Sequence, residues 1–143
     1  MNMNAASAAQ GKPLPALDGL AGEFYRWGAQ GELRFQRCSG CGRYRHVPRE
    51  MCAHCGSPKW VWERSSGRGK VFSWTVVERP LHPAFAGDAP YAPVIVELDE
   101  GVRMLSRVLD CAPDELSIGM AVEVAFSRVT DELYLPCFRR SGV

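Results

Sequence analysis

Four of the six cysteines fall into two Cys-x-x-Cys pairs, Cys38 with Cys41 and Cys52 with Cys55. The second cysteine of each pair is followed by a glycine, which can supply the positive φ that such a turn often needs. Four thiolates at this spacing can close a tetrahedron around one zinc ion. A single pair would fit a redox dithiol equally well, but two matched pairs close together favour a metal. We therefore predict a structural zinc site, with iron in the same cage or a pair of disulfides as alternatives.

The rest of the sequence offers no convincing catalytic set, because a nucleophile would need a histidine and a carboxylate beside it. We expect His46 and His54, which are near the predicted cage, to be exposed, and His82 has no obvious partner in the sequence. Cys111 and Cys137 fall outside the metal spacing, and we expect both to be small buried hydrophobic residues. A catalytic zinc would keep one coordination position open, whereas four cysteines close it. We assign no catalytic residue and favour a non-catalytic binding role.

Short strands are expected to hold the two cysteine pairs. The sequence predicts strands at residues 32–37, 43–48 and 59–64, the last with Trp60 and Trp62 on one face. Residues 32–65 are therefore predicted to form a zinc ribbon with little core of its own. In such a module the metal supplies much of the folding free energy.

A short helix is predicted upstream of the ribbon, within residues 17–31. Asp18 can cap it, and Leu20, Phe24 and Trp27 recur at the spacing of one helical face. Glycines at positions 28 and 31 are expected to end it. Its aromatic side chains either pack on the rest of this chain or dock into another subunit. Residues 1–16 are poor in the bulky residues that a core needs, and we expect a disordered tail.

The pattern changes after a Ser/Gly-rich linker at residues 65–69. Five strands are predicted at residues 70–79, 91–98, 102–109, 120–129 and 133–139, with a helical turn at 113–116. Five short antiparallel strands with a brief helical piece after the third fit a small OB-fold barrel, here spanning residues 66–143. The predicted fold class is therefore mainly β: a short N-terminal helix, a zinc ribbon and a five-stranded OB-fold barrel.

Charge is distributed unevenly along a chain whose formal net charge is +1. Residues 34–70 hold nine basic and two acidic side chains, whereas residues 71–143 hold six basic and eleven acidic ones. The basic stretch is either a solvated face or a surface that attracts phosphate or an acidic partner. We find no signal-peptide pattern and no apolar run long enough to span a membrane, and so expect a reducing, cytoplasmic setting.

Several motifs in this order resemble a known family. They are Phe24-Tyr25-x-Trp27-Gly28-x-x-Gly31-x-Leu33, Gln36-Arg37-Cys38-x-x-Cys41-Gly42, Pro48-Arg49-x-x-Cys52-x-x-Cys55-Gly56-Ser57, Ser66-Gly67-Arg68-Gly69-x-Val71 and Ile118-Gly119-Met120-x-Val122. The chain resembles the acyl-CoA-associated proteins built from an N-terminal helix, a rubredoxin-like zinc ribbon and an OB-fold, over roughly residues 20 to 140. It departs from the family at residues 45–48, where a more apolar, proline-rich run would be expected.

The resemblance implies an accessory subunit in lipid or aromatic catabolism. Members typically form hetero-oligomers with thiolase-like enzymes, namely thiolases, acyltransferases and lipid-transfer-protein-like aldolases, and the partner supplies the catalytic groups. The four cysteines match the family's zinc ligands. The candidates for contacts with the partner or with coenzyme A are Phe24, Trp27, Arg43, Arg45, Arg49 and Arg68.

Two other functions compete with this one. Zinc ribbons and OB-folds both bind single-stranded nucleic acid, but the acidic OB half opposes a polyanion. A stand-alone enzyme using Cys111, Cys137 or His82 is the third hypothesis.

Overall fold

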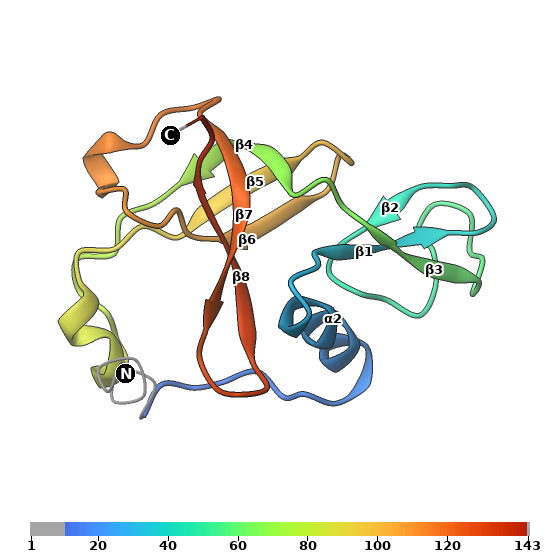
Figure 1. Cartoon of the computed structure of the whole chain (residues 1–143), viewed down its shortest axis with the longest axis horizontal. Coiled ribbons are helices and arrows are strands. Elements are labelled where there is room, and N and C mark those ends of the chain that lie inside the picture. Colours follow the sequence, from blue (N-terminus) through green and yellow to red (C-terminus); the bar gives the residue numbers. More distant parts are fainter. Residues whose placement is uncertain (1–10, 143) are drawn as a thin grey trace.

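The structure, a computed structural model, describes residues 11–142. Helix α2 (Gly19–Ala29) lies between a small lobe and a larger one, as Figure 1 shows. The small lobe is a three-stranded antiparallel sheet in the order β2-β1-β3. Its strands are β1 (Arg34–Cys38), β2 (Tyr44–Arg45) and β3 (Trp60–Arg64). The three predicted ribbon strands are thus confirmed, with β2 shorter than expected.

The larger lobe is a curled sheet of five antiparallel strands in the order β6-β5-β4-β7-β8. Its strands are β4 (Arg68–Trp74), β5 (Val94–Leu98), β6 (Arg103–Ser106), β7 (Ala121–Arg128) and β8 (Tyr134–Arg140). A parallel bridge between Val108 and Phe138 brings the chain just beyond β6 against β8. The predicted OB-like sheet is confirmed, because this bridge links its first and last strands.

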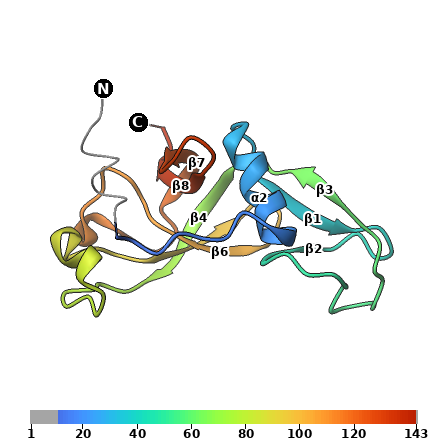
Figure 2. The same ribbon diagram turned by 90° about the horizontal axis from the view of Figure 1, so that it is seen from below.

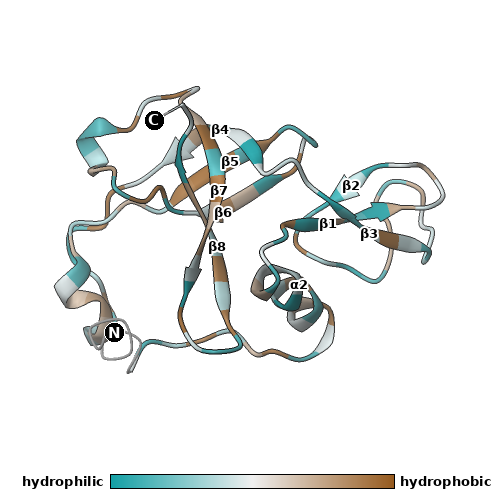
Figure 3. Ribbon diagram, in the orientation of Figure 1, coloured by the Kyte–Doolittle hydropathy of each residue, from teal (hydrophilic) through white to brown (hydrophobic). Residues whose placement is uncertain are grey.

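Two short 3₁₀ helices lie in the loops between strands of the barrel. One, η2 (Pro113–Glu115), occupies the expected position between the third and fourth strands of the barrel. The other, η1 (Pro83–Asp88), lies in the long loop between β4 and β5. An antiparallel bridge between Val77 and Tyr91 closes the base of this loop. Figure 3 shows the barrel strands carrying long hydrophobic stretches, whereas β1 and β2 are mostly hydrophilic.

The linker between the lobes is tighter than the sequence predicts, since β4 already begins at Arg68. Gly67 has a φ of +75°, and a Cβ there would lie 2.6 Å from Cγ1 of Val124. The buried Ser65 hydroxyl donates to Glu100, and the Gly67 amide donates to the Ser65 hydroxyl at 3.0 Å. These contacts fix the direction in which the ribbon leaves the barrel.

Helix α2 belongs to the same core as both lobes. Phe24 stacks on Phe35 of β1 at 6.5 Å between ring centroids, and both belong to one buried cluster with valines of β4, β5 and β7. Gly28 packs against Phe126, at the opposite side of the helix junction. The helical aromatics therefore serve the chain's own packing first.

Two details of the predicted helix need correction. Asp18 has the extended backbone of an N-cap, but its side chain makes no capping hydrogen bond. Gly28 lies inside the helix, and only Gly31, with a φ of +79°, follows its end. Residues 1–10 of the predicted tail lie outside the described residues, and residues 11–17 run to the helix without regular structure. No helix in the described part is both long and apolar enough to cross a bilayer.

Candidate metal centre and adjoining hollows

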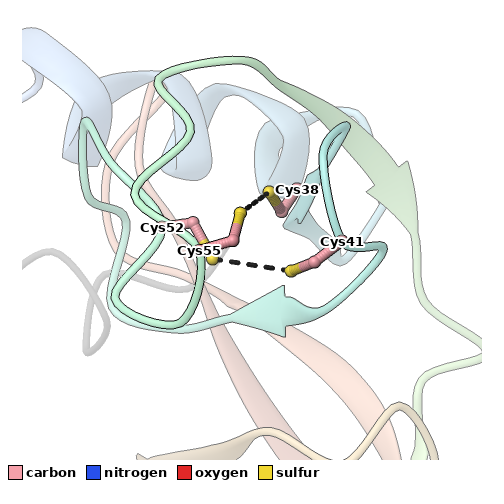
Figure 4. Close-up of side chains that lie close together, drawn as sticks. All are labelled: Cys38, Cys41, Cys52 and Cys55. Atoms are coloured by element: carbon pink, nitrogen blue, oxygen red, sulfur yellow. Dashed lines mark hydrogen bonds between the residues drawn. The ribbon is translucent and has the colours of Figure 1, made fainter.

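The four cysteine sulfurs converge on one point at the tip of the ribbon (Figure 4). All four lie within 4.8 Å of one another, with Cys38 and Cys55 separated by 3.5 Å and Cys41 and Cys52 by 3.7 Å. A regular tetrahedron with Zn–S bonds of about 2.3 Å has S···S edges of about 3.8 Å. The cage therefore fits a zinc ion closely, and its fourth corner is filled by protein.

Both cysteine pairs are built on the same backbone turn. The Gly42 amide donates to the Cys38 carbonyl at 2.9 Å, and the Gly56 amide donates to the Cys52 carbonyl at 2.8 Å. Both glycines have a positive φ, of +78° and +77°, as the sequence predicts. A side chain at Gly40 would crowd the cage, since its Cβ would lie 3.1 Å from Cβ of Ser57 and 3.3 Å from the Cys55 sulfur.

Backbone amides prepare two of the thiols for a metal. The amide of Cys41, followed by that of Gly40, lowers the pKa of Cys38 to about 6. The amides of Cys55 and His54 lower the pKa of Cys52. For Cys55 the amide of Ser57 acts in the same direction, but the other three thiols and burial outweigh it and raise the pKa to about 11. Without a metal, the Cys55 thiol therefore keeps its proton at neutral pH.

The geometry makes this a structural zinc site, as predicted. Four cysteines occupy every corner, so no position is left for water or substrate. The metal joins the loop after β1 to the loop before β3 in a lobe with few buried side chains. Its binding free energy contributes directly to folding of the ribbon.

His46 contradicts the prediction that it is exposed. Its ring lies 5.0 Å from that of Phe24 and 5.4 Å from that of Phe35, between the helix and β1. Burial lowers its pKa to about 4, and among the residues that the structure describes its Nδ1 atom has no hydrogen-bond partner. The imidazole is therefore neutral at pH 7 and packs as a half-buried aromatic ring. His54 is exposed, as predicted.

Three of the predicted contact arginines line one hollow of about 340 Å³ beside the cage, which we call the ribbon pocket. Arg43 and Arg49 are exposed, and among the described residues neither has an acidic partner. Arg45 is half-buried and committed locally, since it donates to the Gln36 side chain at 2.9 Å and to the Arg49 carbonyl at 2.8 Å. His54 and Met51 complete the rim.

Gln36 positions this pocket, a role that the sequence did not reveal. Its side chain is completely buried in β1, and its Oε1 accepts hydrogen bonds from the Arg49 amide at 2.7 Å and from Arg45. It thereby anchors the segment that carries the arginines. A glutamine in a short strand rich in charged residues gives no signal that distinguishes it from an exposed one.

The other three candidates lie elsewhere. Phe24 is only 7% exposed and offers little surface to a partner. Trp27 is half-buried, with the Arg34 guanidinium stacked on its indole at 4.1 Å from the ring centroid. Arg68 is exposed at the start of β4, 3.9 Å from Asp99, and lines neither hollow described here.

A second and much larger hollow of about 1120 Å³ runs beneath α2, along β6 and β8; we call it the apolar groove. Figure 1 and Figure 2 show the segment before α2 crossing from the η1 loop to the helix, and residues 12–15 of this segment form one wall. The cysteines outside the cage lie here: Cys137 is buried, as predicted, whereas Cys111 is half-exposed. Burial raises the pKa of Cys111, so it is a poor nucleophile.

Comparison with known proteins identifies both lobes. The family model described as "ChsH2, rubredoxin-like zinc ribbon domain" matches residues 28–61, and "ChsH2, C-terminal OB-fold domain" matches residues 62–127. A solved structure titled "Ltp2-ChsH2(DUF35) aldolase" contains a chain 38% identical to this one, with a TM-score of 0.80. The match covers 90% of this chain and 99% of that one.

Two curated relatives differ in length from each other. A "DUF35 domain-containing scaffold protein" of Methanocaldococcus jannaschii is 38% identical over 67% of this chain and 68% of its own length. A "Probable enoyl-CoA hydratase alpha subunit" of Thermomonospora curvata is 38% identical over 90% of this chain. The present chain spans only 40% of that hydratase subunit.

Proposed function

Because this chain belongs to the DUF35 family of zinc-ribbon and OB-fold proteins, we propose that it is a non-catalytic accessory subunit of a thiolase-like enzyme. The partner is a thiolase, an acyltransferase or an aldolase, and the complex turns over acyl-CoA. The observation that carries this proposal is the match, over nearly its entire length, to the DUF35 chain of an aldolase structure. Relatives named as scaffold proteins support the same role.

The residues at hand agree with a supporting role. The zinc cage is closed by four cysteines, so it cannot present an activated water. His46 is packed between aromatic rings, and Nδ1 of His82 accepts a hydrogen bond from the Ala84 amide at 3.1 Å. None of the six cysteines forms a disulfide, which suits a cytoplasmic location, where thiols stay reduced.

We also propose that Arg43 and Arg49 contact the phosphates of coenzyme A. Both guanidinium groups are exposed in the ribbon pocket, and neither forms an ion pair with a described acidic residue. Guanidinium groups bind phosphate oxygens through paired, charge-assisted hydrogen bonds. Trp27 and Arg68 remain candidates for contacts with the protein partner.

Co-expression with a thiolase-fold enzyme of the same organism tests the proposal. The two chains should elute together in size-exclusion chromatography, and the complex should be more active on acyl-CoA than either chain alone. Separate elution, with full activity in the enzyme alone, would overturn it.

A further inference from the structure

The two hollows of this chain are neighbours. His46 and Val47 line both the ribbon pocket and the apolar groove, so the two meet on either side of this dipeptide. One is basic and belongs to the ribbon, and the other is apolar and lies between α2 and the barrel. A ligand long enough to pass over His46 and Val47 would contact both lobes.

The groove has the lining of a site for an apolar group. Buried side chains form its floor, and proline, alanine and aromatic side chains form its walls; they include Met104, Val108, Leu116, Ala21, Tyr25 and Phe85. Leu105 and Val47 at its margin are 66% and 56% exposed, an unfavourable arrangement for large apolar side chains in water. At about 1120 Å³ the hollow lies just above the usual range of ligand-site volumes, which is about 300–1,000 Å³.

The charges at the two ends differ in the way that an amphiphile requires. Arg43, Arg49 and His54 surround the ribbon pocket, where the described residues supply no carboxylate. In the groove Lys12 pairs with Asp88 at 2.6 Å and Arg128 pairs with Asp131, so among the described basic side chains of its lining only Arg107, which donates to the Ser127 hydroxyl, lacks an acidic partner. An anionic head is therefore attracted to the ribbon end, and an uncharged, apolar tail fits the other.

We propose that the apolar groove binds the acyl group of a CoA thioester whose phosphates lie in the ribbon pocket. The inference deepens the proposed function and rests on it for the identity of the head group. It assigns this chain a direct part in choosing the acyl group, with preference for long or bulky apolar ones. An apolar segment of the partner could also fill the groove, but it would have no use for the adjoining arginines.

Affinity as a function of acyl length tests the groove directly. The zinc-loaded full chain, alone and in complex with its partner, is titrated calorimetrically with CoA, butyryl-CoA and dodecanoyl-CoA below its micelle concentration. Each methylene that enters the groove should tighten binding, by up to about fourfold. We expect at least a hundredfold gain from CoA to dodecanoyl-CoA in either form of the protein.

Two matched pairs of variants separate the ends of the site. Ala21→Trp fills the groove from the exposed face of α2, whereas Ala29→Trp makes the same change on this helix outside the groove. The first should abolish the gain with acyl length and leave CoA affinity unchanged, and the second should behave like the wild type. Arg49→Glu should weaken all three ligands at least tenfold, but Lys59→Glu, on the ribbon outside both hollows, should not.

The outcomes distinguish this inference from the proposed function. If the complex forms but affinity does not depend on acyl length in the free chain or the complex, the groove inference is wrong and the accessory role stands. If Ala21→Trp prevents complex formation and leaves acyl-CoA affinity unchanged, the groove holds a segment of the partner instead. If no complex forms at all, the accessory role fails, and acyl-length dependence in the free chain still decides the groove.

Discussion

Stability should fall with pH below neutrality because of His46. Its pKa is about 4 in the folded chain, against an ordinary value of 6.5, because burial between two phenyl rings disfavours the charged form. A group whose pKa is lower when folded takes up its proton more readily when unfolded. The stabilisation is therefore complete above pH 6.5 and is lost as pH falls from 6.5 towards 4.

The size of this loss follows from the two pKa values. At pH 5 the unfolded chain binds the proton almost fully and the folded chain hardly at all, which costs about 2 kcal/mol of unfolding free energy. Below pH 4 the cost approaches about 3 kcal/mol. Replacing His46 by Phe keeps an aromatic ring between Phe24 and Phe35 and removes the titrating group.

The assay is urea unfolding of zinc-loaded wild type and His46→Phe at pH 7.5 and pH 5.0. Acid also weakens zinc binding, but it does so in both proteins, so the difference between them isolates His46. The variant should gain about 2 kcal/mol relative to wild type on going from pH 7.5 to pH 5.0. His54→Phe, at an exposed position, should show no such gain. An equal pH dependence in wild type and His46→Phe would refute the argument.

Three further outcomes are expected. Removing zinc with a chelator should unfold the ribbon and release the partner, which circular dichroism and size-exclusion chromatography would detect; a metal-free chain that kept both its fold and its partner would contradict a structural role. Gly67→Ala should cost about 2–4 kcal/mol in chemical unfolding, because it combines a positive φ with a clash against Val124, while Gly87→Ala, in open space, should be neutral; equal stabilities would be inconsistent with the linker geometry. Gln36→Ala should cost about 1–3 kcal/mol in the same assay by leaving the Arg49 amide without its acceptor, and an unchanged midpoint would show that this buried bond is dispensable.

The sequence predicts those parts of this molecule that depend on local spacing. The cage follows from the distances between cysteines along the chain, and the barrel strands follow from alternation and turn residues. Side-chain roles that depend on distant neighbours are harder to predict. Nothing in Arg45-His46-Val47 indicates that its middle residue packs half-buried against Phe24, because Phe24 lies 22 residues earlier in the chain.

The hollows illustrate the same limit. Arg43, Arg45 and Arg49 are close in sequence, and their charge alone marks them as candidates. Their structural roles differ: Arg45 is hydrogen-bonded to Gln36, whereas Arg43 and Arg49 form no ion pair among the described residues. This difference depends on how β1 pairs with β2. The apolar groove combines segments from residue 12 to residue 137, and no pattern along the chain brings these together.

The stacking of Phe24 on Phe35 has a consequence for anyone who would recombine this protein with its relatives. Sequence patterns divide the chain neatly at residue 65, but the buried cluster extends across that point from the helix and β1 into β4, β5 and β7. A chimaera joined at the linker would inherit two mismatched halves of a single interior. Exchange of the barrel alone should therefore fail unless the helix is exchanged with it, so evolution can be expected to have moved these modules as one unit.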